Sequence, residues 1–208
     1  MKRVFSLIAI LAFALPALAQ TPEEIISKME SELQKHKDSK TLYMVMDLDM
    51  PIVGEVSSTS YMWHDKFRVD ALVKGETVTT WTDGKTEWTY IAKNNEIIVN
   101  NAKPKTKSAT DGDVGMFSGI TEGYDVTMTK ETSDAWYFKC KKSKSNKDKD
   151  APKTMDLAVK KGNYYPKSLS FKAMGISMTM RDISFDVTEK QATFDAANYP
   201  GATITDKR

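Results

Sequence analysis

The chain has 208 residues, one cysteine, and 30 basic residues against 28 acidic ones. A chain of this length usually forms one domain and buries a core without covalent staples, and the lone Cys140 excludes an intrachain disulfide framework. The near balance of charge argues against nucleic-acid binding, which depends on many basic contacts to phosphate.

The N-terminus has the pattern of an export signal. Two basic residues precede an apolar run over residues 4–15, and Ala17-Leu18-Ala19 matches the small-x-small pattern of a signal peptidase site. The run is shorter than the roughly 20 residues that a membrane-spanning helix needs. We therefore expect residues 1–19 to be removed on export, and residues 20–208 to form a single domain in the periplasm with a net charge near zero.

The mature chain opens with the signals of a helix. Thr21 is placed to cap the helix, Pro22 fits its first position, and Glu24 completes a capping box with Thr21. The apolar residues that follow recur at helical spacing and lie on one face: Ile25, Ile26, Met29 and Leu33. This stripe predicts a helix that lies on a sheet.

From residue 42 the apolar period changes to two. The alternating residues of the first strand are Leu42, Met44, Met46, Leu48 and Met50. Further strands are predicted at 56–63, 66–73, 77–82, 86–92, 96–99, 124–130, 134–141, 154–160, 167–173, 176–181 and 183–188. Asp83-Gly84 and Asn94-Asn95 supply tight turns. The fold class is therefore α+β, mainly β, with one large antiparallel sheet that must curl at this length.

Two segments interrupt the strands. Residues 110–120 place Met116 and Phe117 among glycines, and we expect a short helix or loop that lies loosely over the sheet. Residues 141–150, KKSKSNKDKD, are expected to be a solvated hairpin loop, and the sequence assigns them no function.

The chain offers little for catalysis. Its two histidines are His36, in the first helix, and His64, beside Asp65, and neither belongs to a metal or nucleophile motif. Cys140 lies in phase with Trp136 and Phe138, which favours a buried, inert thiol. We therefore expect a protein that is not an enzyme and that needs no cofactor or metal.

Methionine is unusually frequent, with 12 in the chain. Several occupy strand positions in phase: Met44, Met46, Met50, Met62, Met128, Met155, Met178 and Met180. Flexible, polarizable methionines repack around ligands of irregular shape such as acyl chains. An ordinary core between sheet and helix is the alternative for each methionine taken singly. Together with the tryptophans, however, they form more apolar surface than one amphipathic helix covers, which indicates a lipid site.

We expect the lipid-binding face to combine strand residues with the short lid. The candidate residues are Met44, Met46, Leu48, Met50, Trp63, Phe67, Trp81, Trp88, Tyr90, Met116, Phe117, Met178 and Met180. If the first helix gates the cavity, its apolar face, with Ile25, Met29 and Leu33, forms the gate.

Several segments together resemble the LolA-like periplasmic lipoprotein carriers. The segment 64–68, HDKFR, resembles that family's turn before a Phe-Arg pair, and 82–90, TDGKTEWTY, resembles its central hairpin. Near the C-terminus, YPKSL at 165–169 with Met174-Gly175-Ile176, and Phe194 with YPGA at 199–202, are similar to its closing strands and terminal segment. No single motif is specific, but their order covers most of residues 22–206.

The resemblance implies an incomplete β-barrel closed by helices, with acyl chains held on its concave face. It also implies a monomeric shuttle that takes acylated lipoproteins from an inner-membrane exporter to an outer-membrane acceptor, with transient membrane proximity. In these carriers an arginine before the Phe-Arg pair holds the lid closed. Here His64 and Asp65 stand in that region, so His64 and Arg68 are the gating candidates, with a plain β-turn as the alternative. A lipid-binding sensor or envelope scaffold without transport stays the alternative function.

Overall fold

The computed structural model describes residues 20–36, 41–51, 54–73, 75–102, 117, 119–149, 151–173 and 175–208. The predicted export signal at 1–19 and Met116 lie outside the described residues.

Helix α1, Pro22–His36, begins where the capping signals predicted. The backbone N–H of Thr21 donates to Glu24 Oε2 at 3.1 Å, and the N–H of Glu24 donates to Thr21 Oγ1 at 3.2 Å. This reciprocal pair satisfies two N–H groups that a helix start leaves without intrahelical partners. The apolar face of α1 is fully buried, as its spacing predicted.

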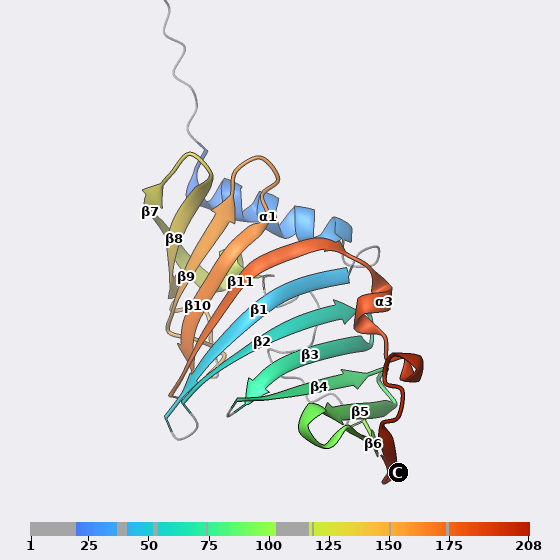
Figure 1. The fold of residues 1–208 in the computed structure, drawn as a ribbon. Helices are drawn as coiled ribbons and strands as arrows, with labels where there is room; N and C mark the ends of the chain where they lie inside the picture. Colours follow the sequence, from blue (N-terminus) through green and yellow to red (C-terminus); the bar gives the residue numbers. More distant parts are fainter. Residues whose placement is uncertain are drawn as a thin grey trace, which may run out of the picture.

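Within the described residues, twelve strands form one sheet, shown in Figure 1. They are β1 (Thr41–Met50), β2 (Gly54–Trp63), β3 (Lys66–Val73), β4 (Glu76–Thr82), β5 (Thr86–Ile91), β6 (Glu96–Asn101), β7 (Tyr124–Glu131), β8 (Ala135–Lys142), β9 (Thr154–Lys160), β10 (Pro166–Ala173), β11 (Ile176–Val187) and β12 (Thr203–Asp206). Their spatial order is β12-β6-β5-β4-β3-β2-β1-β11-β10-β9-β8-β7. The predicted mainly antiparallel sheet is confirmed.

Two details of the sheet differ from the sequence prediction. The segments expected at 176–181 and 183–188 are one strand, β11, which carries Asp182 at a positive φ of 55° and meets β1 through two register shifts. The local irregularity looked like a strand end in the sequence because it interrupts the alternation. Strand β12, which the sequence did not predict, pairs in parallel with β6.

Short helical elements stand at the ends of strands. They are η1 (Ala92–Asn94), α2 (Ile120–Gly123), α3 (Glu189–Ala192) and η3 (Ala196–Asn198). The turn at η1 ends on Asn95 with φ 47°, which fits the expected Asn94-Asn95 turn. Gly84, at φ 83°, provides the other predicted tight turn.

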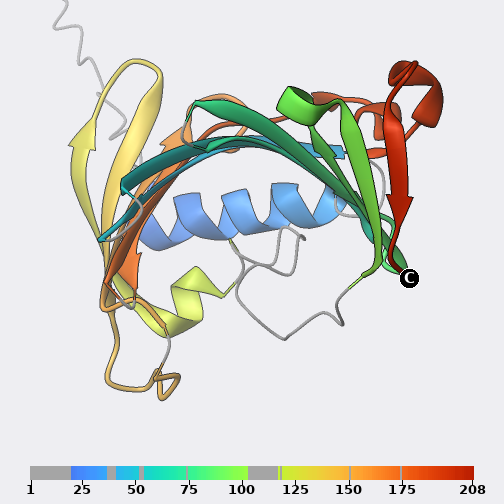
Figure 2. The ribbon, with the colours of Figure 1, turned by 60° about the horizontal axis from the view of Figure 1, so that its bottom comes forward.

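The sheet is strongly curved, and α1 lies inside the curve (Figure 2). Side chains of α1, the sheet and the segment before β7 share one core: Ile25, Ile26, Met29, Leu33, Leu42, Met44, Met62, Phe117, Ile120, Phe138, Cys140, Met155, Leu157, Val159, Leu169, Met180, Ile183 and Phe185. The core therefore fills the concave side between α1 and the strands from β1 and β2 across to β8.

Candidate functional site

The strand register decides which side chains share the concave face with α1. Leu42 of β1, which belongs to the core, is paired with Met62 of β2, and Met46 is paired with Met180 of β11. Leu48 is likewise paired with Met178. Directly paired residues point to the same side of a sheet. The strand methionines therefore line the face that α1 covers, as the period of two predicted.

Helix α1 is held on this face mainly by apolar packing. Its four apolar side chains are at most 1% exposed. Polar contacts add to this at the two ends of the helix. The Tyr164 hydroxyl donates to Gln20 Oε1 at 3.1 Å, and the Tyr165 hydroxyl lies 2.5 Å from His36 Nε2. The helix thus behaves as an apolar plug with polar contacts at both ends.

The short helix α2 closes the same face from beside α1. Phe117 is fully buried and Ile120 is 3% exposed, and both belong to the core shared with α1. The backbone N–H of Ile120 donates to Glu30 Oε1 at 2.9 Å, which joins α2 to α1. The glycine-containing segment expected over the sheet therefore does cover it at Phe117 and Ile120, the residues that the structure describes.

The concave face carries few reactive groups. Cys140 is buried in its core, and burial raises the pKa of its thiol to about 11, so the thiol is protonated at neutral pH. The buried hydroxyl of Ser58 donates to the Met46 carbonyl at 3.3 Å. Among the described residues, no group of three or more His, Cys, Asp or Glu side chains is arranged to hold a metal ion. The main property of the concave face is therefore its apolar surface, which can be buried against a helix or a ligand.

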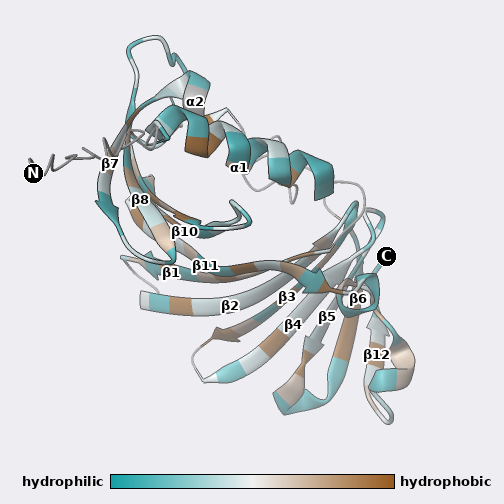
Figure 3. Cartoon of the chain, turned by 90° about the horizontal axis from the view of Figure 1, so that it is seen from above, coloured by the Kyte–Doolittle hydropathy of each residue, from teal (hydrophilic) through white to brown (hydrophobic). Residues whose placement is uncertain are grey.

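Apolar residues continue along the concave face beyond the core around α1. By register they share the side of Leu42 and Met46, and they are half-buried: Leu48, Met50, Val56, Val69, Ala71, Val78, Ile91 and Ile98. Figure 3 shows the brown, apolar bands recurring along these strands. Between them stand uncharged hydroxyls, and Thr80 and Thr89 hydrogen-bond across β4 and β5 at 3.4 Å. The α1-covered core therefore extends into a mixed strip of apolar and hydroxyl side chains, which by register also carries Glu87 and Glu96 near the β5–β6 edge.

Trp81 and Trp88 do not join the methionines on this face, whereas Trp136 packs against the concave core. Phe67 is paired with Met62 and lies on the concave side, but Arg68 is paired with Trp81, and Trp81 with Trp88. Adjacent strand residues point to opposite sides, so these residues lie on the convex face. The expectation of a single apolar face is corrected. The number of residues in the turn between two strands decides which residues pair and therefore which side chains point to the concave face. The turn sequences did not reveal that number.

The remaining candidates also lie away from α1. Tyr90 and Trp63 belong to the convex side by the same register. His64 is exposed in the β2–β3 turn, with φ 53° and its ring 4.6 Å from the Trp63 ring. Arg68 pairs with Asp70 at 3.0 Å. The structure therefore places both sequence-derived gating candidates outside contact with the α1 face.

The C-terminal segment with Phe194 and Tyr199, for which the sequence predicted no place in a site, covers the convex aromatic residues. The Phe194 ring stacks on Trp88 at 4.9 Å and 12°, and Tyr199 approaches Trp81 at 5.5 Å and Tyr90 at 4.5 Å. Trp81 is only 2% exposed as a result. The signal was present in the terminal aromatic residues, but nothing in the sequence stated which strand they would reach. Trp81 and Trp88 thus belong to a second, smaller core on the convex side.

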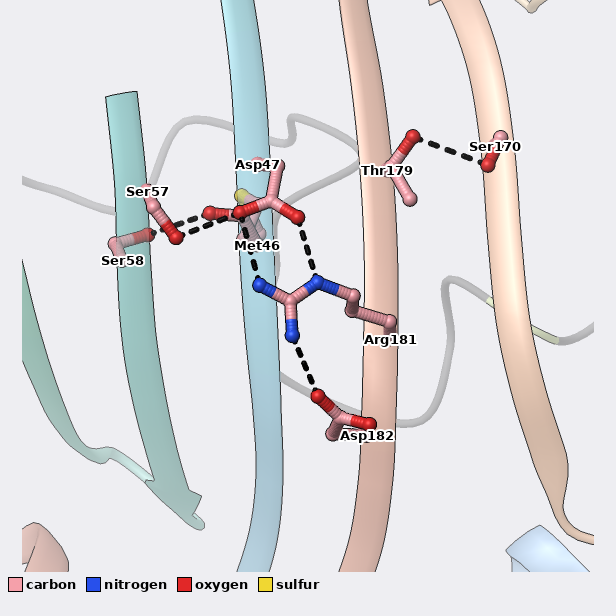
Figure 4. Close-up of polar contacts among 8 residues, drawn as sticks. All are labelled: Met46, Asp47, Ser57, Ser58, Ser170, Thr179, Arg181 and Asp182. Atoms are coloured by element: carbon pink, nitrogen blue, oxygen red, sulfur yellow. Dashed lines mark hydrogen bonds and ion pairs between the residues drawn. The ribbon is translucent and has the colours of Figure 1, made fainter. Parts of the chain in front are cut away.

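The centre of the convex face is polar, as Figure 4 shows. Arg181 of β11 donates through Nε to Asp47 Oδ2 at 2.7 Å and through Nη1 to Asp182 at 2.6 Å. Ser57 of β2 donates to the other oxygen of Asp47 at 2.6 Å. The guanidinium and the hydroxyl hold the pKa of Asp47 below its usual range. This face therefore suits solvent, and the concave face suits an apolar ligand.

The fold has counterparts among solved structures. No protein-family model and no curated protein matches the chain. Lipoprotein LppX of Mycobacterium tuberculosis aligns with TM-score 0.52 at 9% identity, over 81% of this chain and 99% of that one. An uncharacterized conserved protein of Thermus thermophilus aligns at 0.46 with 16% identity, over 90% and 100%. A LolA superfamily protein of Nitrosomonas europaea aligns at 0.32 with 12% identity, over 85% and 99%.

The comparison with LppX shows a shared fold, because its score is above 0.5 while its identity is low. Together with one helix inside a curved, open and mainly antiparallel sheet, it confirms the incomplete β-barrel with a helix on its concave side that the sequence resemblance implied. Among the described residues, no helix combines the length and the apolar character needed to cross a membrane.

Proposed function

We propose that this protein is a periplasmic carrier that binds the acyl chains of lipoproteins on its concave face and moves them from the inner to the outer membrane. The observation that carries the proposal is the methionine-lined concave face beneath α1. Methionines at Met44, Met46, Met62, Met155 and Met180 meet an amphipathic helix there, on a LolA-like fold. A surface rich in methionine accepts different chain shapes at similar cost.

The energies of helix and cargo are comparable, which exchange requires. Fully burying an aliphatic side chain contributes about 1.5–3 kcal/mol, so the four apolar residues of α1 contribute roughly 6–12 kcal/mol. An acyl chain contributes about 0.8 kcal/mol per buried methylene, so about a dozen methylenes match the helix. An acyl chain that displaces α1 therefore restores the apolar contacts that the sheet loses. Because the two free energies are similar, both loading and release of the cargo are feasible.

The cellular setting follows from the sequence. The predicted export signal at 1–19 supports a periplasmic location for the carrier, and in this proposal an inner-membrane exporter supplies acylated lipoproteins and an outer-membrane acceptor receives them. The gate in this proposal is α1 together with α2. We do not retain Arg68 or His64 in it, since neither side chain contacts α1.

The test is whether acylated cargo occupies the protein when it is isolated gently from periplasm. Native mass spectrometry followed by identification of released molecules should detect acylated lipoprotein bound one to one. Phospholipid or free fatty acid alone would instead favour the lipid-binding sensor or scaffold. An empty protein that also refuses added fatty acid would contradict both functions.

A variant pair locates the site. Met46→Glu places a carboxylate on the concave face and should abolish binding of a fluorescent fatty acid, because burying an unpaired charge costs several kcal/mol. Val45→Glu is the matched control, since Val45 points to the convex face and is paired with Arg181. Circular dichroism checks folding, and Leu48→Glu, outside the core cluster, is a second concave variant. Equal binding by a folded Met46→Glu protein would remove this face from the site.

A further inference from the structure

The positive charge of the chain is concentrated in one hairpin. Residues 139–153, at the end of β8 and in the loop toward β9, contain seven lysines, no arginine and two aspartates. The remainder of the chain has 23 basic and 26 acidic residues. The chain is therefore locally strongly positive at this hairpin and slightly negative elsewhere.

Most of this charge is exposed to solvent. Lys139 pairs with Asp156 at 3.0 Å, and Lys142 donates to the backbone carbonyl of Asp148. Five further lysines of the segment have exposed side chains: Lys141, Lys144, Lys147, Lys149 and Lys153. Repulsion among five like charges is tolerated when they face solvent or a negative surface.

The hairpin is anchored beside the element that covers the concave face. The backbone N–H of Ser143 donates to the Gly123 carbonyl at 3.1 Å, and Asn146 Nδ2 donates to the same oxygen at 3.3 Å. Gly123 ends α2, whose Ile120 lies in the core with α1. The loop extends past α2 in Figure 2, and it is the teal, hydrophilic loop next to α2 in Figure 3. The charge therefore lies at the α2 side of the concave face.

We propose that this lysine hairpin docks the protein on an anionic lipid surface, with the α2 side of the concave face toward the membrane. The side-chain chemistry favours lipid over a protein partner. Protein interfaces are enriched in arginine and aromatic residues and depleted in lysine, and the segment 141–153 has neither arginine nor aromatic residues. Clustered lysines instead gain about 1 kcal/mol each at an anionic membrane without fixed geometry.

Such docking goes beyond cargo binding and does not require it. A fluid surface of phosphate headgroups accepts flexible, strongly hydrated ammonium groups in many arrangements. The attraction falls off within a Debye length, so it acts only when the protein is already close to the bilayer and weakens as salt rises. For a carrier, this would bring α1 and α2 close to the bilayer from which a chain must be taken.

The experiment measures sedimentation of the purified protein with vesicles. Binding is expected to vesicles that mix phosphatidylglycerol with phosphatidylcholine and not to phosphatidylcholine alone. It should weaken when salt rises from about 0.1 M to about 1 M, because the Debye length falls from about 10 Å to about 3 Å. Replacing Lys144, Lys147 and Lys149 by Gln should lower the partition coefficient roughly 100-fold, a factor of about five for each lysine.

The matched control removes the same charge elsewhere. Lys85, Lys172 and Lys190 are exposed lysines outside the hairpin, and their triple replacement by Gln should leave vesicle binding nearly unchanged. Absence of binding to the anionic vesicles, or equal loss in both triple variants, would overturn the docking site. A partner protein that needs the lysines while anionic vesicles are ignored would overturn it as well.

The two proposals fail separately. The hairpin variant should still bind the fluorescent fatty acid in solution, and Met46→Glu should still sediment with anionic vesicles. A wild-type protein that sediments with anionic vesicles but does not bind the fatty acid would contradict the carrier function. The docking surface would still be supported.

Discussion

At the scale of single residues, the two faces of the sheet differ in what they do to titratable groups. On the concave side burial raises the pKa of Cys140 to about 11. On the convex side the Arg181 guanidinium, followed by the Ser57 hydroxyl, lowers the pKa of Asp47. The first shift marks an environment that rejects charge, and the second marks one that accepts it. Both shifts can be tested.

We predict that Cys140 reports on opening of the concave face. At pH 8 its thiol is almost wholly protonated and buried, so the folded protein should react with Ellman's reagent far more slowly than the unfolded protein. Loosening α1 should accelerate the reaction. Complete labelling of the folded protein at the rate of the unfolded chain would show that the thiol is not protected.

We predict that Asp47 contributes to the acid dependence of stability. Its folded pKa is lower than its unfolded value near 4, so its contribution is present above pH 4 and is lost as pH falls through the folded pKa. Because the side chain is 38% exposed, the contribution is at most about 1 kcal/mol. Asp47→Asn should therefore flatten the fall in urea-unfolding free energy between about pH 4 and pH 2. An unchanged pH profile would contradict this role.

At the scale of elements, α1 and the C-terminal segment cover opposite faces. Helix α1 contributes four buried aliphatic side chains to the concave core, whereas Phe194 and Tyr199 contribute rings to the convex aromatic cluster. Strand β12 then adds a parallel edge to β6. The chain thus secures its first element by apolar contact that a ligand can replace, and its last element by backbone pairing.

We predict that Leu33→Ala loosens α1 measurably. Leu33 is 1% exposed, and truncating a buried leucine costs about 2–5 kcal/mol. If α1 gates the site, the variant should also take up fluorescent fatty acid faster in stopped-flow measurements. Ser31→Ala, on the exposed face of the same helix, should change stability by less than about 0.5 kcal/mol. A destabilised Leu33→Ala protein with unchanged uptake would make α1 a fixed wall.

At the scale of the whole molecule, the sheet and α1 are held in place by different kinds of contact. The central strands β1, β2 and β11 are joined by long backbone ladders, with two register shifts between β1 and β11, and α1 is joined to them chiefly by side chains. Backbone pairing cannot be replaced by an acyl chain, whereas apolar contact can. Motion on loading should therefore be confined to one side of the sheet.

We predict that bound cargo raises hydrogen exchange in α1 and leaves the central strands protected. The displaced helix loses its packing, while the strand amides keep their partners. Exchange followed by mass spectrometry, with and without a saturating fatty acid, compares the two states. Equal protection of Pro22–His36 in both states would mean that cargo binds without moving α1.

The sequence by itself determined most of the elements, although not β12 or the unbroken course of β11, because capping and periodicity are local properties. The capping box at Thr21, the alternation from Leu42 to Met50 and the two tight turns all predicted what the structure contains. The sequence did not determine which face of the sheet each side chain of the strands points to. Whether Trp81 joined Met46 depended on pairing through β2 and β3, and a shift of one residue reverses a side chain. Only the tertiary structure placed Trp81 and Trp88 on the face opposite the methionines, because strand register is fixed by contacts between segments far apart in the chain.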